Sequence, residues 1–411
     1  MIIWLFNHYA YTPEQSGITR HYDLAQSLIA RGHQVRIFAA GFHHGRQVEM
    51  CEYAPGKNVQ HTCVGDIQYS WIKVPAYQSS GWRRLLGMWL YRCRAYAAAC
   101  ELSSQETPDV IVGSSPHLWA AQAAAKVARR LKCGFGLEIR DIWPDTLIEL
   151  GVARWHPLVR NLQRLAKRLY QQADAIVSPL PDFKRYLQDQ GYDRAVMWLP
   201  NGISVQPAQV FTAPKSNSAE PFRVIYAGNL GAANNLSVAI EAAEIVQQQG
   251  VSVEWHIYGH GVMQETLQQQ INRQAQPHVF LHTPVAKQAL GPILQSADAL
   301  LFTLPDLPVF QYGIAPNKLN DYFLAGRPIL FVCNAANNPV SAAQAGLSVP
   351  VADPMALADA VHNLMKLPLS ERIKMGRNGF DYVHQHYNLD RVAEQLQSVL
   401  LAIAQKPDIA S

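Results

Sequence analysis

The chain alternates short apolar runs with longer amphipathic stretches along almost its whole length. Apolar runs of about four to eight residues predict buried strands, and amphipathic stretches of about ten or more predict helices. Strands with the turns that follow them are predicted at 2–7, 34–40, 109–115, 134–140, 174–180, 223–228, 253–261, 278–282, 297–304 and 327–332. Helices are predicted at 18–32, 117–132, 182–191, 234–250, 263–274 and 317–325. Strands that alternate with helices predict parallel sheets covered on both faces.

The pattern stops at residues 206–221, QPAQVFTAPKSNSAEP, which are rich in Pro, Ser and Ala and are typical of a linker. A chain of 411 residues is also too long for one ordinary core. We therefore predict an N-terminal domain at 1–205, a second domain at 222–385, and a helix within 386–411 that crosses back to the first domain. The predicted fold class is α/β, with two doubly wound Rossmann-like domains facing a central cleft. Ligands are expected at the carboxyl ends of the strands.

Composition fits a folded chain, since 49% of the residues are hydrophobic and 16% are charged. No apolar run is long enough to predict a membrane-spanning helix. The start, Met1 to Phe6, lacks the basic residues of a signal peptide and predicts a strand, so we expect a cytoplasmic protein. Six cysteines without Cys-x-x-Cys spacing predict reduced thiols.

Several nucleotide and metal motifs are missing from the sequence. The first strand–helix turn, NHYAYTPEQSG, contains only Gly17, which disfavours a dinucleotide dehydrogenase, and no P-loop pattern occurs. His-Glu-x-x-His and Asp-x-Asp are also absent. The pairs His43-His44 and His384/His386 lack companion ligands, so we expect neither a metal site nor another cofactor.

One stretch, YGIAPNKLNDYFLAGRPIL at 312–330, combines an apolar helix with a polar start. Pro316 is expected at the first helical position, where unpaired amides and the helix dipole favour an anion. Asn317, Lys318 and Asp321 share one helix face. The set fits a nucleoside diphosphate, with the phosphates at Lys318 and the ribose hydroxyls on Asp321. An ordinary Lys318–Asp321 surface ion pair is the alternative.

The same stretch resembles the proline-serine-lysine-leucine segment of family 4 glycosyltransferases, which ends in alanine-glycine-lysine-proline. Further resemblance lies in HYAYTPEQSGITRHYDLAQSLIARGHQVRIFAA (8–40), LEIRDIWPDTLIELG (137–151), LPNGI (199–203) and YAGNLG (226–231). The segments follow the family's order over almost the whole chain, and the bacterial O-antigen and capsule branch (WbuB-like) is the most similar. The resemblance implies the two-domain GT-B fold and metal-independent sugar transfer with retention of configuration.

The resemblance also implies roles for residues of the second domain. Lys318 and the backbone of Ala315, Pro316 and Asn317 would bind the donor diphosphate, and Asp321 the ribose. The family's first acid contacts the donor sugar, but Gly313 stands in its place here. Tyr312, Ile314 or another loop must therefore contact the sugar. The loop AGNLG contains no basic residue, which leaves the amides from Gly228 to Gly231 and the Asn229 side chain. The strand residues Phe280, His282 and Thr283 would meet the base through backbone groups.

In the first domain, the resemblance implies that Ser16 and Gly17 form a flexible loop that closes on the donor. Arg140 and Asp141 are candidates for orienting the acceptor or balancing charge, with a structural ion pair as the alternative. His117 is either a contact of the donor sugar or a helix cap. Glu138, Asp141 and Asp145 leave a covalent carboxylate nucleophile open. The mechanism that the resemblance implies needs no such nucleophile, because the leaving diphosphate takes the acceptor proton.

Charge is unequal between the halves, with 23 Lys and Arg against 16 Asp and Glu in residues 1–205, and 12 against 15 in the rest. The basic half is expected to face an anionic partner. Two basic amphipathic stretches support this, 82–94 with Trp82, Leu85, Leu86, Trp89 and Cys93 on one face, and 154–170 with a leucine stripe. They predict either helices on an anionic inner leaflet or ordinary core faces.

The sequence thus predicts a cytoplasmic glycosyltransferase, peripheral on the membrane, that moves sugar from a nucleotide sugar to a glycan or a polyprenyl-diphosphate-linked acceptor. No nucleic-acid-binding module is visible, so nucleic acid is not an expected partner. A nucleotide-sugar 2-epimerase of the same fold and a catalytically silent nucleotide-sugar-binding protein are the alternatives.

Overall fold

The computed structural model describes residues 1–15, 19–44, 46–77, 81–149, 151–204, 210–213 and 220–405. The chain forms two compact units: unit 1 contains residues 1–204 and the C-terminal segment from Leu389, and unit 2 contains residues 205–388. The return to unit 1 therefore comes three residues after the position expected from the sequence. Part of the expected linker belongs to unit 2, because the Thr212 carbonyl accepts a hydrogen bond from Arg327 Nη1 at 2.8 Å.

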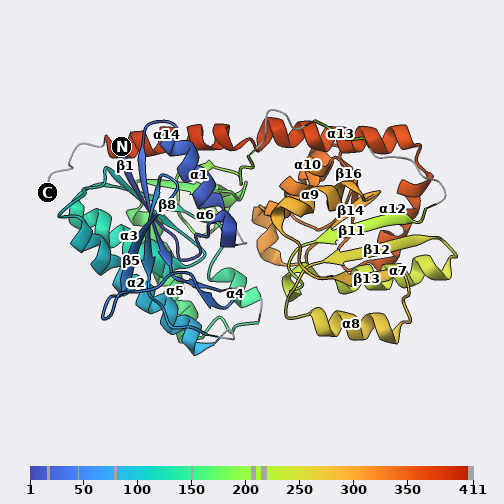
Figure 1. Ribbon diagram of the computed structural model, residues 1–411, viewed down its shortest axis with the longest axis horizontal. Helices are drawn as coiled ribbons and strands as arrows, with labels where there is room; N and C mark the ends of the chain where they lie inside the picture. The colour runs from blue at the N-terminus through green and yellow to red at the C-terminus, as the bar shows by residue number, and fades with distance from the viewer. Residues whose placement is uncertain are drawn as a thin grey trace. The chain divides into compact units, whose positions relative to one another are not determined.

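Unit 1 is built on an eight-stranded sheet in the order β10-β9-β8-β7-β1-β2-β6-β5 (Figure 1). The strands are β1 (Ile2–Phe6), β2 (Gln34–Ala40), β5 (Val59–Val64), β6 (Ile67–Ile72), β7 (Val110–Ser114), β8 (Gly134–Glu138), β9 (Ala175–Ser178) and β10 (Val196–Trp198). A separate two-stranded sheet pairs β3 (Phe42–His43) with β4 (Val48–Glu49). The large sheet is parallel except at its edge, where β5 pairs antiparallel with β6. The sequence analysis missed this hairpin, because it searched for continuous apolar runs, whereas the middle of β5 (VQHTCV) is polar and β6 (IQYSWI) carries Gln and Ser between its apolar residues.

Helices cover both faces of the unit 1 sheet. They are α1 (Arg20–Ile29), α2 (Trp82–Leu102), α3 (Leu118–Leu131), α4 (Asp145–Glu149), α5 (Pro157–Gln172), α6 (Phe183–Asp189) and α14 (Leu389–Ala404), with a short 3-10 turn, η1 (Pro13–Gln15). Helices α1 and α14 share a core with one face, and α2, α3 and α5 lie on the other (Figure 1). Gly113 permits close packing there, because a Cβ at this position would lie 2.7 Å from the Cα of Ala121.

The two basic amphipathic stretches of unit 1 differ in whether their predicted apolar face is buried. In α5 the leucine stripe faces the core, since Leu162, Leu165 and Leu169 are buried, which settles this stripe as a core face. In α2 the inward face is formed by Gly87, Met88, Tyr91 and Ala95, whereas the predicted apolar face that begins at Trp82 is exposed.

Unit 2 is built on a six-stranded parallel sheet in the order β13-β12-β11-β14-β15-β16. The strands are β11 (Phe222–Ala227), β12 (Val253–Tyr258), β13 (Val279–His282), β14 (Ala299–Thr303), β15 (Ile329–Val332) and β16 (Gly346–Val349). The helices are α7 (Ser237–Gln248), α8 (Gln264–Arg273), α9 (Lys287–Gln295), α10 (Asn317–Ala325), α11 (Pro339–Ala342), α12 (Pro354–Lys366) and α13 (Leu369–His386), with 3-10 turns η2 (Ala232–Asn234) and η3 (Pro308–Tyr312).

In each sheet the chain first adds strands on one side of the first strand and later adds strands on its other side. In unit 1 the chain leaves β1 for β2 on one side and later adds β7 on the other. In unit 2 it leaves β11 for β12 and later adds β14 on the opposite side. Ligands of open parallel sheets bind beside the carboxyl ends of the strands at such a switch point. The prediction of two doubly wound α/β units is confirmed. Within the described residues, no helix is long and apolar enough to cross a membrane.

Candidate functional site

In unit 2, Lys318 lies at the switch point between β11 and β14. It is the second residue of α10, and its Nζ is 2.5 Å from Asn234 Oδ1 and 3.0 Å from Tyr226 Oη. The same ammonium lies 4.6 Å from the centre of the Tyr226 ring and 5.6 Å from that of Phe302. Within the described chain Lys318 forms no ion pair with Asp321, so the surface pair considered from the sequence is not what the structure contains.

This enclosure changes the proton affinity of the amine. Burial lowers the pKa of Lys318 to about 7, because the charged form loses hydration and no carboxylate of the described residues pairs with it. The tip of Lys318 also faces the loop after β11, since a Cβ on Gly228 would lie 3.2 Å from Nζ. An anion at this position would supply the missing countercharge. The site therefore has the electrostatics of an anion site.

The loop after β11, which contains Gly228, Asn229 and Gly231, is held in a fixed shape. The Asn229 carbonyl accepts hydrogen bonds of 2.9 Å from Tyr226 Oη and from Asn234 Nδ2. The Gly228 amide donates to the Tyr258 carbonyl, so it is engaged within the protein. Tyr226 and Asn234 thus contact both this loop and Lys318. The sequence analysis missed both residues.

Helix α10 has the predicted bounds, Asn317–Ala325, but Pro316 is not the first helical residue that the sequence analysis expected. Pro316 is the N-cap residue, with φ −78° and ψ 123°, and Asn317 is the first helical residue. The ring of proline fixes φ but leaves ψ open, and the extended ψ keeps Pro316 outside the helix. The Leu319 amide donates to the Pro316 carbonyl at 3.3 Å. In the described chain the amides of Asn317 and Lys318 have no acceptor, as expected for a helix N-terminus.

The loop before α10 contains Tyr312, Gly313, Ile314 and Ala315. Gly313 has φ 96° and ψ 167°, a conformation that favours glycine. This backbone explains why no acid stands at the position where the family's first acid is expected. Both backbone groups of Ile314 are bound by the side chain of Asn337, at 2.7 and 3.0 Å, and Asn337 is another residue that the sequence analysis missed.

The expected base-binding strand, β13, forms an aromatic face together with β12. His282 stacks on Tyr258 with 4.2 Å between ring centres, and its Nε2 lies 2.9 Å from Nδ1 of His256. Phe280 stacks on His256 at 5.0 Å. Thr283 follows the strand and is exposed. The Gly259 amide donates to the His282 carbonyl, which ties the carboxyl ends of β12 and β13 together.

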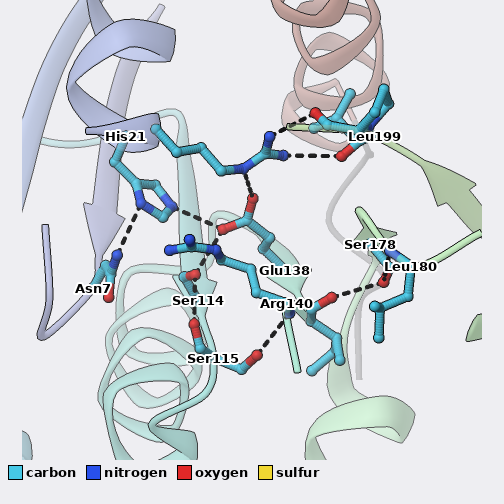
Figure 2. Close-up of polar contacts among 12 residues, drawn as sticks. Asn7, His21, Ser114, Ser115, Glu138, Arg140, Ser178, Leu180 and Leu199 are labelled. Carbon is cyan, nitrogen blue, oxygen red and sulfur yellow. Dashed lines mark hydrogen bonds and ion pairs between the residues drawn. The ribbon is translucent and has the colours of Figure 1, made fainter. Parts of the chain in front are cut away.

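In unit 1, Glu138 forms the centre of a buried polar cluster at the carboxyl end of β8 (Figure 2). Its Oε1 lies 2.9 Å from Arg20 Nε, and its Oε2 lies 2.8 Å from His21 Nε2 and 2.6 Å from Ser114 Oγ. Arg20 Nη1 and Nη2 also donate to the carbonyls of Pro200 and Leu199. The cluster thus connects α1, β7, β8 and the segment that follows β10.

The protonation states in this cluster follow from its partners. Burial alone would raise the pKa of Glu138, but the cationic surroundings reverse this and hold it well below its usual range. Burial lowers the pKa of His21 despite Glu138, so we assign a neutral ring. Its Nε2–H then donates to Glu138, and its Nδ1 accepts from Asn7 Nδ2 at 2.8 Å. Arg20 is therefore the principal counter-ion of Glu138.

Arg140 lies beside this cluster (Figure 2). Its backbone amide donates to Ser115 Oγ at 2.8 Å, whereas its guanidinium has no hydrogen-bond partner among the described residues. Burial lowers the pKa of Arg140, and the nearby Glu138 carboxylate opposes this change. With Arg20 and Arg140 cationic, Glu138 anionic and His21 neutral, the four side chains carry a net charge of +1.

The remaining acids near β8 have structural partners. Asp141 accepts hydrogen bonds from Thr146 Oγ1 at 2.9 Å and Trp143 Nε1 at 3.1 Å. Burial raises the pKa of Asp141, and these hydrogen bonds oppose the rise. Asp145 accepts from Tyr186 Oη at 2.9 Å. All three carboxylates considered as nucleophiles therefore already accept hydrogen bonds within the protein.

His117 caps helix α3 and stacks against a second histidine. Its Nδ1 accepts from the Ala120 amide at 2.8 Å, which places the proton of the neutral ring on Nε2. Burial lowers the pKa of His117 to about 3. The ring of His8 lies 4.7 Å away, centre to centre. Nε2 of His117 has no partner in the described chain, so a buried N–H donor remains unpaired at the β1/β7 switch point.

Ser16 and Gly17, expected in a loop that closes on the donor, lie outside the described residues. The other predicted residues fall into separate groups. In unit 2, Lys318 is brought to the loop that begins at Gly228. In unit 1, Arg140 lies beside Glu138, whereas Asp141 accepts hydrogen bonds from Trp143 and Thr146 around the start of α4.

Comparisons with known proteins agree with this architecture. Residues 16–202 match the family model described as glycosyl transferase 4-like domain, and residues 221–366 match that described as glycosyl transferases group 1. No curated protein sequence matches the chain.

Solved structures with the same fold cover nearly the whole chain. Sucrose-phosphate synthase from Thermosynechococcus elongatus has a TM-score of 0.72 at 14% identity, with 98% of each chain covered. Anabaena HepE, in complex with UDP and glucose, has a TM-score of 0.64 at 14% identity, with 98% of this chain and 99% of that one covered. WaaG, a glycosyltransferase involved in lipopolysaccharide biosynthesis, has a TM-score of 0.66 at 13% identity, with 97% and 99% covered. These likenesses establish the GT-B fold.

Proposed function

The chain is a glycosyltransferase built of a glycosyl transferase 4-like domain and a group 1 domain, and from this premise we propose its donor, acceptor and stereochemistry. The donor is a nucleotide-diphosphate sugar, with UDP as the favoured nucleotide. The acceptor is a glycan or a polyprenyl-diphosphate-linked glycan in bacterial surface polysaccharide synthesis. Transfer retains the anomeric configuration and needs no metal. The enzyme works in the cytoplasm, on the inner face of the membrane, as a member of family 4 and of its O-antigen and capsule branch.

The observation that carries this proposal is the enclosed ammonium of Lys318. It faces the Gly228 loop at the β11/β14 switch point and has no carboxylate partner among the residues that the structure describes, which supports binding of a diphosphate. The unpaired amides at the start of α10 add donors and the positive end of the helix dipole. Asp321, one turn further along α10, is the proposed ribose contact.

Unit 1 supports a reaction without a covalent enzyme intermediate. Glu138, Asp141 and Asp145 are all engaged in hydrogen bonds, so none offers an unengaged carboxylate. Lys318 and the α10 amides would stabilise the leaving diphosphate as its charge develops. The diphosphate oxygen would take the proton of the attacking hydroxyl on the same face of the sugar. Arg140 and the Nε2–H of His117 are the proposed contacts from unit 1.

The proposed donor and pathway also draw on structures of similar fold. HepE was solved with UDP and glucose, and WaaG acts in lipopolysaccharide biosynthesis. These identities are low, so both points come to this chain only as support. The basic N-terminal half, with 23 Lys and Arg against 16 acids, supports an anionic acceptor or its carrier.

The test is a panel of nucleotide sugars offered to the purified protein without metal, with binding, slow donor hydrolysis and transfer to lipid-linked acceptors all recorded. We expect diphosphate release from one donor and a loss of about 100-fold or more in Lys318→Ala, since the variant lacks the charge that meets the leaving group. Lys374→Ala is the matched control, because Lys374 is an exposed lysine of the same unit.

Other outcomes separate the alternatives. Binding without turnover, even with lipid-linked acceptors, would favour a silent nucleotide-sugar-binding protein. Conversion of the donor sugar to its 2-epimer would favour the epimerase. If no nucleotide sugar binds, the proposal for Lys318 is wrong.

A further inference from the structure

Helix α2 presents four large apolar side chains to solvent. Trp82 is 69% exposed and Trp89 45%, with Leu85 and Leu86 between them at 36% and 37%. These residues recur at the three- and four-residue spacing of one helix face. We call them the α2 apolar patch. They are not part of the unit 1 core, since the opposite face of α2 supplies the packing against that unit.

A groove lies beside the next turns of the same helix, with a volume of about 520 Å³. It is lined by Arg92, Cys93 and Tyr96 from α2 and by Lys126, Arg129 and Arg130 from α3. Four of these six residues are cations and none is an acid. We call it the basic groove. Lys126, Arg129 and Arg130 are exposed, so their charges are accessible from solvent.

The apolar patch and the basic groove form one continuous surface. The guanidinium of Arg92, which lines the groove, lies 5.9 Å from the ring centre of Trp89, which belongs to the patch. Arg92 is held in place by a 3.0 Å hydrogen bond to Gln122 of α3. A second cation, Arg83, lies 5.6 Å from the ring of Trp82.

Charge on the neighbouring helices has the same sign. Helix α3 contacts both α2 and α5, and α3 and α5 contain seven Lys and Arg but no Asp or Glu. On α5, Arg160, Arg164, Lys167 and Arg168 are exposed, while the leucine stripe faces the core. This layer of unit 1 therefore presents a broad positive field around a small apolar area.

We propose that the α2 apolar patch and the basic groove together dock unit 1 on an anionic phospholipid bilayer. The phosphate of a lipid headgroup occupies the groove between Arg92 and the cations of α3. The tryptophans and leucines of α2 enter the boundary between headgroups and acyl chains, where tryptophan is favoured. A phosphate alone would need only the groove, so the adjoining apolar patch selects a lipid surface.

This inference rests on the proposed location at the inner face of the membrane and deepens it by assigning the docking surface, but it does not depend on the donor site. It concerns α2 and α3, whereas nucleotide-sugar chemistry is assigned to α10 and the strand ends. A protein that binds no nucleotide sugar could still bind the bilayer through this surface, and the reverse also holds. The two proposals therefore fail separately.

The experiment is co-sedimentation of the full chain with phosphatidylcholine vesicles that contain or lack phosphatidylglycerol. We expect binding to the anionic vesicles, weakened by high salt because exposed charges are screened. Arg129→Glu with Arg130→Glu should weaken that binding about tenfold or more, since each cation near an anionic surface contributes. Trp82→Ser with Trp89→Ser should weaken binding to the anionic vesicles at low salt. The binding that remains should fall more steeply with added salt than that of the natural chain.

Matched controls use exposed residues of unit 2. Arg273→Glu with Lys374→Glu makes the same change of net charge, and Val262→Ser with Met355→Ser removes exposed apolar side chains. Both controls should bind within about twofold of the natural chain. Equal weakening in the charge control would mean that only net charge matters and would overturn the assigned surface.

Two further results would also contradict the proposal. Unchanged vesicle binding in both α2/α3 variants would exclude this surface as the docking site. Saturable binding of inorganic phosphate with no binding to anionic vesicles would assign the groove to a soluble anion. Circular dichroism spectra of all variants should match that of the natural chain, because every substituted side chain is at the surface.

Discussion

The ammonium of Lys318 lies between the side-chain oxygen of Asn234 and the ring of Tyr226, at 2.5 Å from the first and 4.6 Å from the centre of the second. Both contacts are neutral. A lysine in such surroundings gives up its proton more easily than one in water, and it regains the proton when an anion arrives. The pH dependence of nucleotide binding should therefore report on this residue.

The affinity for UDP is expected to fall as the pH rises above about 7. Burial lowers the pKa of Lys318 to about 7, and the diphosphate favours the charged amine, so binding at higher pH must take up a proton. The dissociation constant should rise toward about tenfold for each pH unit between about 7 and 9. Titration calorimetry with UDP measures this.

Lys318→Arg is the control for this prediction, because arginine stays protonated throughout the range. Its dissociation constant should change by less than about twofold over the same interval. A natural chain that shows no pH dependence would mean that Lys318 does not meet the diphosphate.

At the residue scale, sequence reasoning identified the residues of α10 better than their partners. The Pro-Asn-Lys start was visible because its members are adjacent in the chain. Asn234 and Tyr226 were not, since they lie 84 and 92 residues from Lys318 and only the fold brings them to it. Gly313 was noticed as a departure from the family, but its cause, a φ of 96°, is a backbone property.

At the scale of elements, one buried ion pair joins the start of α1 to the end of β8. Arg20 comes soon after the first strand, Glu138 ends β8, and the carbonyls of Leu199 and Pro200 complete the shell of the guanidinium. Ser114 of β7 donates to the same carboxylate, so four segments of unit 1 meet on two side chains. Arg20 and His21 were missed from the sequence, because their partners lie 118 and 117 residues away.

Glu138→Gln is expected to lower the free energy of unfolding of unit 1 by about 3–5 kcal/mol, because Arg20 would keep a buried charge without its counter-ion. The low pKa of Glu138 means that its contribution is present above its ordinary value of 4.5 and is lost as the pH falls through its folded value. Urea denaturation at neutral and acidic pH measures both effects. The variant should lose less stability on acidification than the natural chain.

Glu101→Gln is the matched control, since Glu101 is an exposed residue of α2, and it should change the stability by less than about 0.5 kcal/mol. Equal stability of Glu138→Gln and the natural chain would contradict the assignment of an ionised Glu138.

Alternation of apolar runs and amphipathic stretches predicted most strands and helices, because each period is a local property of the sequence. It failed at the edge of the first sheet. Neither strand of the β5–β6 hairpin is a continuous apolar run, and its antiparallel pairing does not follow the repeated strand–helix pattern. The sequence grouped Trp82, Leu85, Leu86 and Trp89 on one face of α2, but it left open whether that face is exposed or buried, because this depends on which face packs against the sheet.

At the scale of the whole molecule, unit 1 is discontinuous in sequence. Its core includes Val392, Leu396 and Leu400 of α14, which pack with residues of α1 and the central strands. The order of the strands and the return of the last helix depend on contacts between distant segments. The sequence predicted both the position of the domain change and the return of a helix within 386–411, but only the packing shows which residues of α14 enter the core of unit 1.

Leu400→Ala is expected to lower the free energy of unfolding of unit 1 by about 2–5 kcal/mol, since this side chain is fully buried and its loss leaves a cavity. Unit 2 should keep its own stability, because Leu400 belongs to the core of unit 1. Thermal denaturation followed by calorimetry should therefore show a shift of one transition only. Ser398→Ala, an exposed change on the same helix, should leave both transitions within about a degree. A shift of both transitions by Leu400→Ala would mean that the units unfold together.

The place of α14 has a consequence for synthesis on the ribosome. Domains usually fold in the order in which they emerge, the N-terminal one first. Here the second unit is continuous in sequence and is complete at residue 388, whereas the first is completed only when α14, which follows the second unit, has been translated. The unit that is made first is therefore finished last. A premature stop within the last helix would spare unit 2 and leave unit 1 with an uncovered apolar sheet face, a substrate for chaperones and proteases.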